Sequence, residues 1–218
     1  DPIQYFANVA LHYSLAIICW IAIITAVVFG CAGRAVKPVI ETTSATPGGT
    51  ITRGGTPMHL IGTPLTIGGA LPSAVLVDTQ SMKDVDLSKE SGRVLLLSIV
   101  PSLDTKVCDL QTHYLGEAGA ALPDKIQRIT ISRDTPFAQQ RFARKAKLKN
   151  IRYLSDYKRA DFGHSTGLLI DELMLLGRSV VVVDKAGMVR YIQVVPELSH
   201  LPDMEQAFKI ALKLNGTT

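Results

Sequence analysis

The chain has 218 residues, and its 23 Lys and Arg against 19 Asp and Glu leave a net charge of only +4. This small net charge argues against nucleic acid as a partner, and so does the absence of a basic run interleaved with aromatic side chains. Hydrophobic residues make up 47% of the chain and charged residues 19%, which is too apolar for a purely soluble protein of this length.

The apolar excess lies at the N-terminus. No charged residue stands between Asp1 and Arg34, and residues 15–33 read LAIICWIAIITAVVFGCAG. As a helix this run would extend about 28 Å, close to the hydrocarbon thickness of a bilayer. We therefore expect an N-terminal segment, 1–36, in which residues 11–33 form a transmembrane helix in contact with lipid. The chain would then be a single-pass membrane protein.

Two cleaved signals are alternatives to a membrane anchor. A secretory signal peptide would carry a basic n-region, yet residues 1–14 contain no Lys or Arg. The sequence VFGC ending at Cys31 loosely matches a lipoprotein signal, but Phe29 fits that pattern poorly. An uncleaved anchor is therefore favoured.

Flanking charge predicts the orientation of the anchor. Arg34, Lys37 and Arg53 follow it, and no Lys or Arg precedes it. The positive-inside rule then places the following domain in the cytoplasm. The absence of paired cysteines in that domain agrees with a reducing compartment.

Small residues predict how the anchor packs. Ala22, Ala26 and Gly30 are spaced by four, so they share one helical face, which Cys19 extends. Such a face allows a second backbone to approach closely. We expect a transmembrane partner subunit or a second copy of this chain against it. The alternative, that Ala and Gly are simply frequent in membrane helices, stays open.

Residues 37–56 follow the anchor and are rich in Thr, Gly and Pro with few apolar side chains. This composition is typical of a linker that cannot form its own core. If the segment were nevertheless ordered along its length, that order would indicate a partner surface that holds it.

Residues 57–218 change to alternating strand and helix patterns, which predict one folded domain. MHLIGTPLTIGG reads as a hairpin with Gly62 and Pro64 at its turn. A buried strand is predicted for RVLLLSIV, further strands for QRITIS and IRYLSD, and two more for SVVVVDKAGMVRYIQVV. Helical spacing follows over residues 108–122, 137–148, 158–166 and 203–214, the second of these opened by Asp134 and Pro136. This order indicates a sheet covered on both faces, in a thioredoxin-like α/β fold.

Cys108 is the only cysteine of the predicted domain, and its surroundings favour a reactive thiolate. It lies in the first turn of a predicted helix, where free backbone N–H groups and the helix dipole favour negative charge. Thr105 can place a hydroxyl beside the sulfur, Pro101 stiffens and shields the loop, and Arg178 is the candidate cation. The alternative is an inert buried cysteine.

These residues carry a family resemblance. PSLDTKVCDLQT, residues 101–112, resembles the P-x-x-x-T-x-x-C motif of peroxiredoxins, in the PS-x-DT-x-VC form of the thiol peroxidase subfamily. Three further motifs agree with that subfamily, and the resemblance covers about residues 57–215. They are S-x-D-x-PFAQ-x-RF at 132–142, R-x-VVV-x-D at 178–184 and PD-x-E at 202–205.

The resemblance implies a catalytic set and a reaction. Cys108 would attack the O–O bond of a hydroperoxide and become a sulfenic acid, with Thr105 and the loop backbone holding the peroxide. Arg178 would polarise the peroxide and favour the thiolate, and Pro101 would shield the sulfenate. The family needs no metal and no organic cofactor.

One position departs from the family pattern. Thiol peroxidases usually carry a resolving cysteine at the end of RFC, and this chain has Ala143 there. The other cysteines, Cys19 and Cys31, fall in the predicted membrane segment. We therefore expect reduction of Cys108 by an external thiol, which is one-Cys behaviour.

Two functions remain open at this point. The first is a membrane-tethered thiol peroxidase that removes hydroperoxides near the bilayer. The second is an accessory subunit of a larger bacterial membrane complex, respiratory or photosynthetic, with a vestigial peroxiredoxin-like domain. A basic run beside the predicted helix at 137–148 is interpreted as a solvated face, with anionic lipid or an acidic partner as the alternative. Its residues are Arg141, Arg144, Lys145, Lys147 and Lys149.

Overall fold

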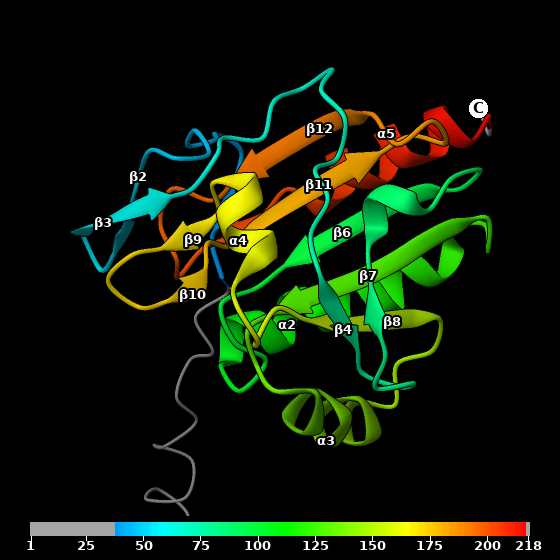
Figure 1. Ribbon diagram of the computed structural model, residues 1–218, viewed down its shortest axis with the longest axis horizontal. Coiled ribbons are helices and arrows are strands. Elements are labelled where there is room, and N and C mark those ends of the chain that lie inside the picture. The colour runs from blue at the N-terminus through cyan, green and yellow to red at the C-terminus, as the bar shows by residue number, and fades with distance from the viewer. Residues whose placement is uncertain (1–37, 217–218) are drawn as a thin grey trace, which may run out of the picture. The chain divides into compact units, whose positions relative to one another are not determined.

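A seven-stranded sheet organises the part of the chain that the computed structural model describes, residues 38–216 (Figure 1). Its strand order is β12-β11-β6-β7-β8-β4-β5. β6, β7 and β8 run parallel, and the other neighbours pair antiparallel. The bounds are β4 Leu76–Asp78, β5 Asp84–Val85, β6 Val94–Ile99, β7 Ile126–Ser132, β8 Ile151–Ser155, β11 Ser179–Val183 and β12 Val189–Val194.

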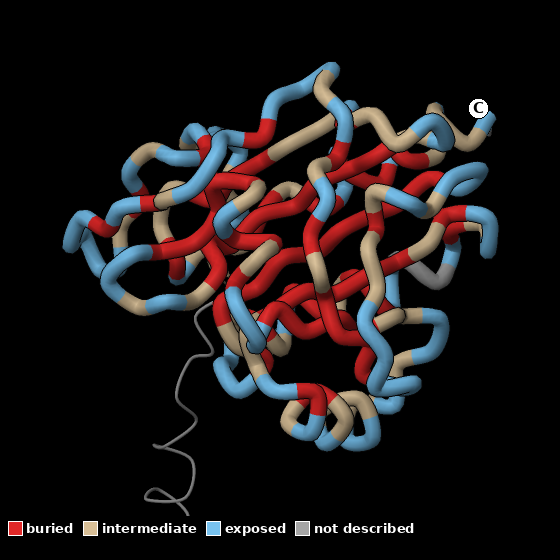
Figure 2. Tube along the Cα trace, in the orientation of Figure 1, coloured by how far each residue is buried: buried red, intermediate tan, exposed pale blue. Residues whose placement is uncertain are grey.

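Side-chain alternation along β6 separates two hydrophobic cores. All six β6 residues are buried, as expected for a central strand covered on both faces (Figure 2). Val94 and Leu96 pack in one cluster with Phe208, and Leu95 and Leu97 pack in another with Phe162. The predicted thioredoxin-like α/β fold has this two-faced arrangement.

The helices agree with the predicted helical segments in order and approximate bounds. They are α2 Lys106–Glu117, α3 Pro136–Ala146, α4 Asp161–Thr166 and α5 Met204–Asn215, with short 3-10 helices η1 Leu87–Lys89 and η2 Ala118–Ala121. α3 begins differently from the prediction, because Thr135 is its N-cap and accepts a hydrogen bond from Ala138 N at 3.4 Å. Asp134 is thereby free for another role.

A second, four-stranded sheet has the order β10-β9-β3-β2. Its strands are β2 Thr50–Arg53, β3 Thr56–Ile61, β9 Leu169–Ile170 and β10 Leu175–Leu176. β2 and β3 form a hairpin whose two turn residues, Gly54 and Gly55, have φ of +58° and +81°. Positive φ at both turn positions matches the right-handed twist of the strands.

The predicted hairpin around Gly62 and Pro64 is therefore wrong. β3 pairs with β2 before it and with β9 after it, not with the residues that follow Gly62. Gly62 has φ +112°, and a Cβ there would lie 2.2 Å from the His164 carbonyl oxygen. This glycine permits close packing against α4 rather than a turn between two strands.

The segment predicted as a linker, 37–56, also differs in the structure, because residues 38–56 belong to the domain. β1 (Ile40–Glu41) pairs in parallel with β13 (Leu201–Pro202), and β2 lies wholly within the segment. Its few apolar side chains are supplemented by the rest of the chain, so that Ile51 is 1% exposed. Since the domain itself holds this segment, its order does not indicate a partner surface.

The predicted membrane anchor cannot be compared with the structure. Residues 11–33, including Ala22, Ala26 and Gly30 of the expected packing face, lie outside the described residues. Between residues 38 and 216, no helix has the length and apolar character needed to cross a bilayer.

Candidate active site

Cys108 occupies the first turn of α2, two residues after the helix begins. The preceding strand, β6, ends at Ile99, and the loop 100–105 leads from it into the helix. The Cys108 side chain is fully buried, and its backbone carbonyl accepts a hydrogen bond from Thr112 Oγ1 at 2.8 Å. Its sulfur therefore lies near backbone N–H groups that have no partner within the helix, where negative charge is favoured.

Arg178 immediately precedes β11, which is the neighbour of β6 in the sheet. This pairing brings the arginine to the end of β6 from which the loop departs. Its Nη2 donates to Cys108 Sγ at 3.4 Å, and the whole side chain is 2% exposed. None of the ion pairs among residues 38–216 involves Arg178. The sulfur thus faces a buried positive charge that no carboxylate neutralises.

Gln111 completes the contacts of the guanidinium and was not predicted as a site residue. Its Oε1 accepts from Arg178 Nη1 at 2.9 Å, while its Nε2 donates to Ser98 Oγ at 2.9 Å. It stands three residues after Cys108, on the same helical face. That spacing is the sequence signal that could have identified it.

The other two predicted residues lie in the loop but do not contact the sulfur through hydrogen bonds. Thr105 is exposed, and its hydroxyl donates to the Ser102 carbonyl at 3.1 Å rather than to Cys108. Pro101 is buried next to Val100, whose N–H donates to Ile131 O at 3.0 Å. The structure therefore brings Cys108 and Arg178 into direct contact, with Thr105 and Pro101 in the loop that covers them.

Asp134 fastens that loop to the end of β7. Its carboxylate accepts hydrogen bonds from Ser102 Oγ, Leu103 N and Ser132 Oγ, each at 2.7 Å. The sequence interpretation assigned Asp134 to the start of α3, so this role was missed. The S-x-D motif that contains it was the available signal.

A small apolar cluster surrounds the buried thiol. Val100, Leu103 and Tyr153 form it with Cys108, and Ala143 from α3 packs against it. Burial raises the pKa of Tyr153 to about 12. The position where the family carries its resolving cysteine therefore borders the cluster that contains Cys108, although this chain has no thiol there.

A cavity of about 540 Å³ opens beside the same loop. Its walls come from the loop, the N-terminal half of α2 and one face of α3. The lining residues are Ser102, Leu103, Asp104, Thr105, Lys106, Asp109, His113, Asp134, Ala138, Arg141, Phe142, Lys145 and Ala146. Cys108 does not line it: the thiol is fully buried, and Leu103, which packs in the same cluster, lines the cavity instead.

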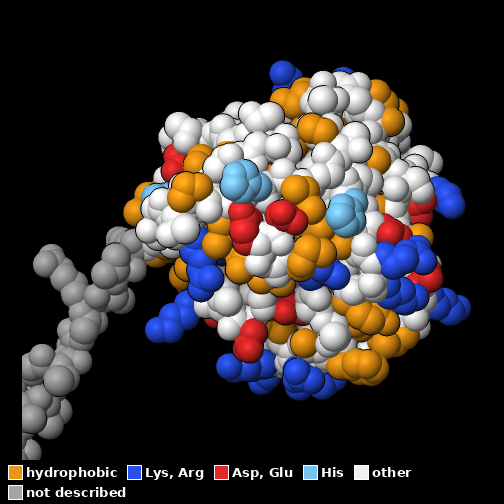
Figure 3. Space-filling view, turned by 60° about the vertical axis from the view of Figure 1, so that its left-hand side comes forward, with side chains coloured by type: hydrophobic (Ala, Val, Ile, Leu, Met, Phe, Trp, Pro, Cys, Tyr) orange, Lys and Arg blue, Asp and Glu red, His pale blue; other side chains and the backbone are white. Residues whose placement is uncertain are grey.

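The basic run at residues 141–149 lies next to this cavity. All five of its Arg and Lys residues are exposed. Figure 3 shows Lys and Arg gathered along the lower edge of the molecule, where α3 lies in Figure 1.

Comparisons with known proteins agree with the fold and the motif. The Redoxin family model matches residues 66–208. The thiol peroxidase of Halalkalibacterium halodurans is 38% identical over 161 residues, which is 74% of this chain and 96% of that protein. The thiol peroxidase of Listeria monocytogenes serotype 4b is 40% identical over 157 residues, 72% of this chain and 94% of that protein.

Solved structures resemble the described domain as well. A peroxiredoxin-like protein from Aquifex aeolicus superposes with a TM-score of 0.72 at 30% identity, over 79% of this chain and 99% of that one. The thiol peroxidase from Chromobacterium violaceum gives 0.66 at 23% identity, over 77% and 97%, which supports the fold alone. The chain therefore belongs to the redoxin family, as a thiol peroxidase-type peroxiredoxin with a thioredoxin-like fold.

Proposed function

We propose that the protein is a thiol-dependent peroxidase that reduces hydroperoxides at Cys108. The observation that carries this proposal is the 3.4 Å contact between Arg178 Nη2 and Cys108 Sγ in the first turn of α2. The helix N-terminus and the buried guanidinium both favour a thiolate, which is the nucleophilic form of cysteine. Relatives named thiol peroxidase support the same chemistry.

In the oxidative step, the Cys108 thiolate attacks one oxygen of the peroxide. An S–O bond forms as the O–O bond breaks, and the departing oxygen takes up one proton, equivalent to the proton that the thiol released on ionising, and leaves as water or an alcohol. The sulfur loses two electrons, the peroxide gains them, and Cys108 becomes a sulfenic acid. The positive charge of Arg178 stabilises the negative charge that moves from the sulfur to the departing oxygen. Thr105 and the backbone N–H groups of the loop 100–105 bind the peroxide, and Pro101 shields the site.

In the reductive step, an external thiol reacts in place of a resolving cysteine. Its sulfur displaces water from the sulfenic acid and forms a mixed disulfide with Cys108. A second thiol then attacks the mixed disulfide, which releases an external disulfide and returns the Cys108 thiol. Because Ala143 offers no sulfur, one equivalent of peroxide is expected to leave a sulfenic acid that dimedone traps. An intramolecular disulfide to Cys19 or Cys31 would contradict this one-Cys cycle.

The proposal includes attachment to a membrane through residues 11–33, with the domain on the cytoplasmic side. Its support is the uncharged apolar run in the sequence. Membrane pellets of cells that express the full chain test it, because an anchored protein stays in the pellet after alkaline carbonate extraction. A variant without residues 1–37 is the control. Release of the full chain by carbonate would contradict the anchor.

The central experiment is peroxide consumption by the full chain with dithiothreitol as the reductant. We expect catalytic turnover of hydrogen peroxide or an organic hydroperoxide, and its loss in Cys108→Ser. A rate that is equal in Cys108→Ser and in the unchanged protein would refute the proposed peroxidase.

A further inference from the structure

The guanidinium of Arg178 has a third hydrogen bond, through Nε, to a residue outside the motif that contains Cys108. Its Nε donates to the carbonyl oxygen of Leu198 at 3.0 Å. Leu198 belongs to the loop that joins β12 to β13, and Val195 at the start of this loop donates through its N–H to Arg178 O at 2.9 Å. The direction of the guanidinium therefore depends on where the loop 195–200 places the Leu198 carbonyl.

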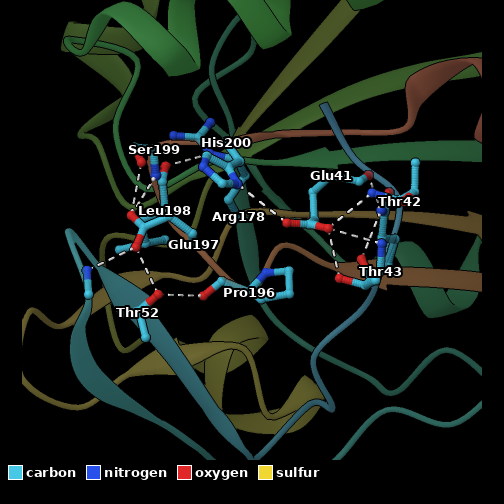
Figure 4. Close-up of polar contacts among 12 residues, drawn as sticks. Glu41, Thr42, Thr43, Thr52, Arg178, Pro196, Glu197, Leu198, Ser199 and His200 are labelled. Atoms are coloured by element: carbon cyan, nitrogen blue, oxygen red, sulfur yellow. Dashed lines mark hydrogen bonds and ion pairs between the residues drawn. The ribbon is translucent and has the colours of Figure 1, made fainter. Parts of the chain in front are cut away.

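Glu197 fixes that loop through its carboxylate (Figure 4). Oε1 accepts hydrogen bonds from Ser199 N at 3.2 Å and Ser199 Oγ at 2.9 Å, which close the loop around Leu198. Oε1 also accepts from Gly54 N at 3.0 Å, and Oε2 accepts from Gly55 N at 3.2 Å and Thr52 Oγ1 at 2.8 Å. One carboxylate thus joins the loop to the turn of the β2–β3 hairpin.

Backbone contacts continue the connection from the hairpin to the Leu198 carbonyl. Thr52 O accepts from Leu198 N at 2.9 Å, and Thr52 N donates to Pro196 O at 2.6 Å. The carbonyl that receives Arg178 Nε and the N–H bound to Thr52 belong to the same residue. A displacement of the hairpin would therefore move the acceptor of the guanidinium.

We propose that Glu197 is a positioning residue for Arg178, which it aims at Cys108 through the Leu198 carbonyl. The inference deepens the proposed peroxidase function and depends on it for its catalytic meaning. Glu197 contacts neither the sulfur nor the guanidinium, so it acts only by holding the loop. A guanidinium whose direction is lost would stabilise the thiolate and the departing oxygen less well.

The charge of Glu197 matters because its carboxylate accepts five hydrogen bonds, from Thr52, Gly54, Gly55 and Ser199. Burial would raise the pKa of Glu197, but hydrogen bonds from Gly54, Thr52, Gly55 and Ser199 outweigh it and lower the pKa to about 2. A glutamine at this position would turn an amide group toward one of these donors. Glu197→Gln therefore keeps the shape of the side chain and removes part of its hold on the loop.

A double-mutant cycle on the full chain tests this assignment. The two readouts are the rate of peroxide consumption and the rate at which iodoacetamide alkylates Cys108 in the reduced protein. We expect Glu197→Gln to lower both rates about tenfold when Arg178 is present. In an Arg178→Ala background, the same substitution should change neither rate by more than about twofold, because the residue through which Glu197 acts is absent.

Glu172→Gln is the matched control. The Glu172 carboxylate accepts from His59 N at 3.0 Å and pairs with His59 Nδ1 at 2.7 Å, so it also binds β3 of the hairpin. It has no hydrogen bond to the loop 195–200 in the structure, and both rates should remain unchanged. If Glu197→Gln does not fold, Thr52→Val replaces it in the comparison. This substitution removes the hydroxyl that donates to Glu197 Oε2 and to Pro196 O of the same loop, and it should lower both rates about threefold.

Two outcomes would overturn the assignment. The first is an alkylation rate in Glu197→Gln, or in Thr52→Val if only that variant folds, that equals the rate of the unchanged protein. The second is a fall of equal size with and without Arg178, which would mean a general effect on folding. If the unchanged protein consumes no peroxide, the proposed function fails, whereas the alkylation cycle still decides whether Glu197 positions Arg178.

Discussion

Asp134 and Glu197 hold the two sides of the candidate active site, and they differ in how far away their partners lie in the sequence. Asp134 binds Ser102 and Leu103 of the loop before Cys108, which are 32 and 31 residues away. Glu197 binds Thr52, Gly54 and Gly55, which are 145, 143 and 142 residues away. Both carboxylates collect hydrogen bonds from a loop and from a second element.

This difference separates a local part of the site from a long-range part. The side of the site that carries Cys108 is built from β6, α2 and β7, which follow one another in the chain. Asp134, which holds the loop before Cys108, therefore lies within the motifs of the family. The arginine side depends on a hairpin whose Thr52, Gly54 and Gly55 precede residues 66–208, which the Redoxin model matches. Variation of the hairpin could therefore tune Arg178 while the cysteine motif stays unchanged.

The largest effect is expected from Asp134→Ala on the cysteine side. The substitution leaves Ser102 Oγ, Leu103 N and Ser132 Oγ without their acceptor, so the loop over Cys108 loosens. We expect peroxide consumption to fall about a hundredfold and the free energy of unfolding to drop by about 2 kcal/mol. Steady-state rates and urea denaturation measure the two effects.

Asp104→Ala is the control for that variant, because Asp104 is exposed in the same loop and its carboxylate accepts no hydrogen bond among the described residues. It should leave both measurements nearly unchanged. Equal losses in Asp134→Ala and Asp104→Ala would mean that the loop depends on total charge and not on the hydrogen bonds of Asp134.

Arg178→Lys should have the next largest effect, on the arginine side. A lysine keeps the positive charge but cannot donate to Leu198 O, Gln111 Oε1 and Cys108 Sγ at once from a planar group. We expect a fall of about thirtyfold in kcat/KM for peroxide. Arg190→Lys, at an exposed pair with Asp184, should retain the original value. Full activity in Arg178→Lys would show that charge alone suffices.

Gln111→Met should have a smaller effect at the point where the two sides meet. Methionine has a similar shape but offers no comparable acceptor to Arg178 Nη1 and no donor to Ser98 Oγ. We expect a fall of about fivefold in kcat/KM, because Leu198 still orients the guanidinium. A loss as large as that of Arg178→Lys would assign the orientation to Gln111 instead of the loop 195–200.

The smallest effect concerns pH and Glu197. Its pKa of about 2 lies below the ordinary value of 4.5, so its ionised form stabilises the fold above about pH 4.5 and loses this contribution as the pH falls toward 2. The difference in unfolding free energy between the unchanged protein and Glu197→Gln should shrink by about 1 kcal/mol from about pH 5 to about pH 3, a value kept small by solvent screening. Urea denaturation followed by circular dichroism measures it, and a constant difference would contradict the prediction.

The sequence predicted the central strands and the helices of the domain because their signals are local. RVLLLSIV and SVVVV are short, mainly apolar runs that become buried strands, QRITIS becomes the strand β7, and α2, α3 and α5 show helical spacing of their apolar residues. The motif around Cys108 likewise indicated the family, which the comparisons confirm.

The hairpin at residues 50–61 shows where local signals failed. Gly54–Gly55 between Thr-rich flanks is a hairpin signal, yet the Thr, Gly and Pro content of residues 37–56 led to the prediction of a linker. The segment has few apolar side chains of its own, and Ile51 becomes buried only because distant strands supply the rest of the core. The composition of a segment does not show which distant residues the fold will pack against it.

By itself, the sequence determined the order of the central strands and of the helices, the placement of Cys108 in the first turn of a helix, and the choice of Arg178 as its cation. Only the tertiary structure decided that Gln111 and the Leu198 carbonyl aim the guanidinium, and that Asp134 and Glu197 hold the loops on either side. The physical reason is that hydrogen bonds of a buried polar group are satisfied by whatever the fold brings within about 3 Å. Those partners come from any distance along the chain, so no local pattern of residues specifies them.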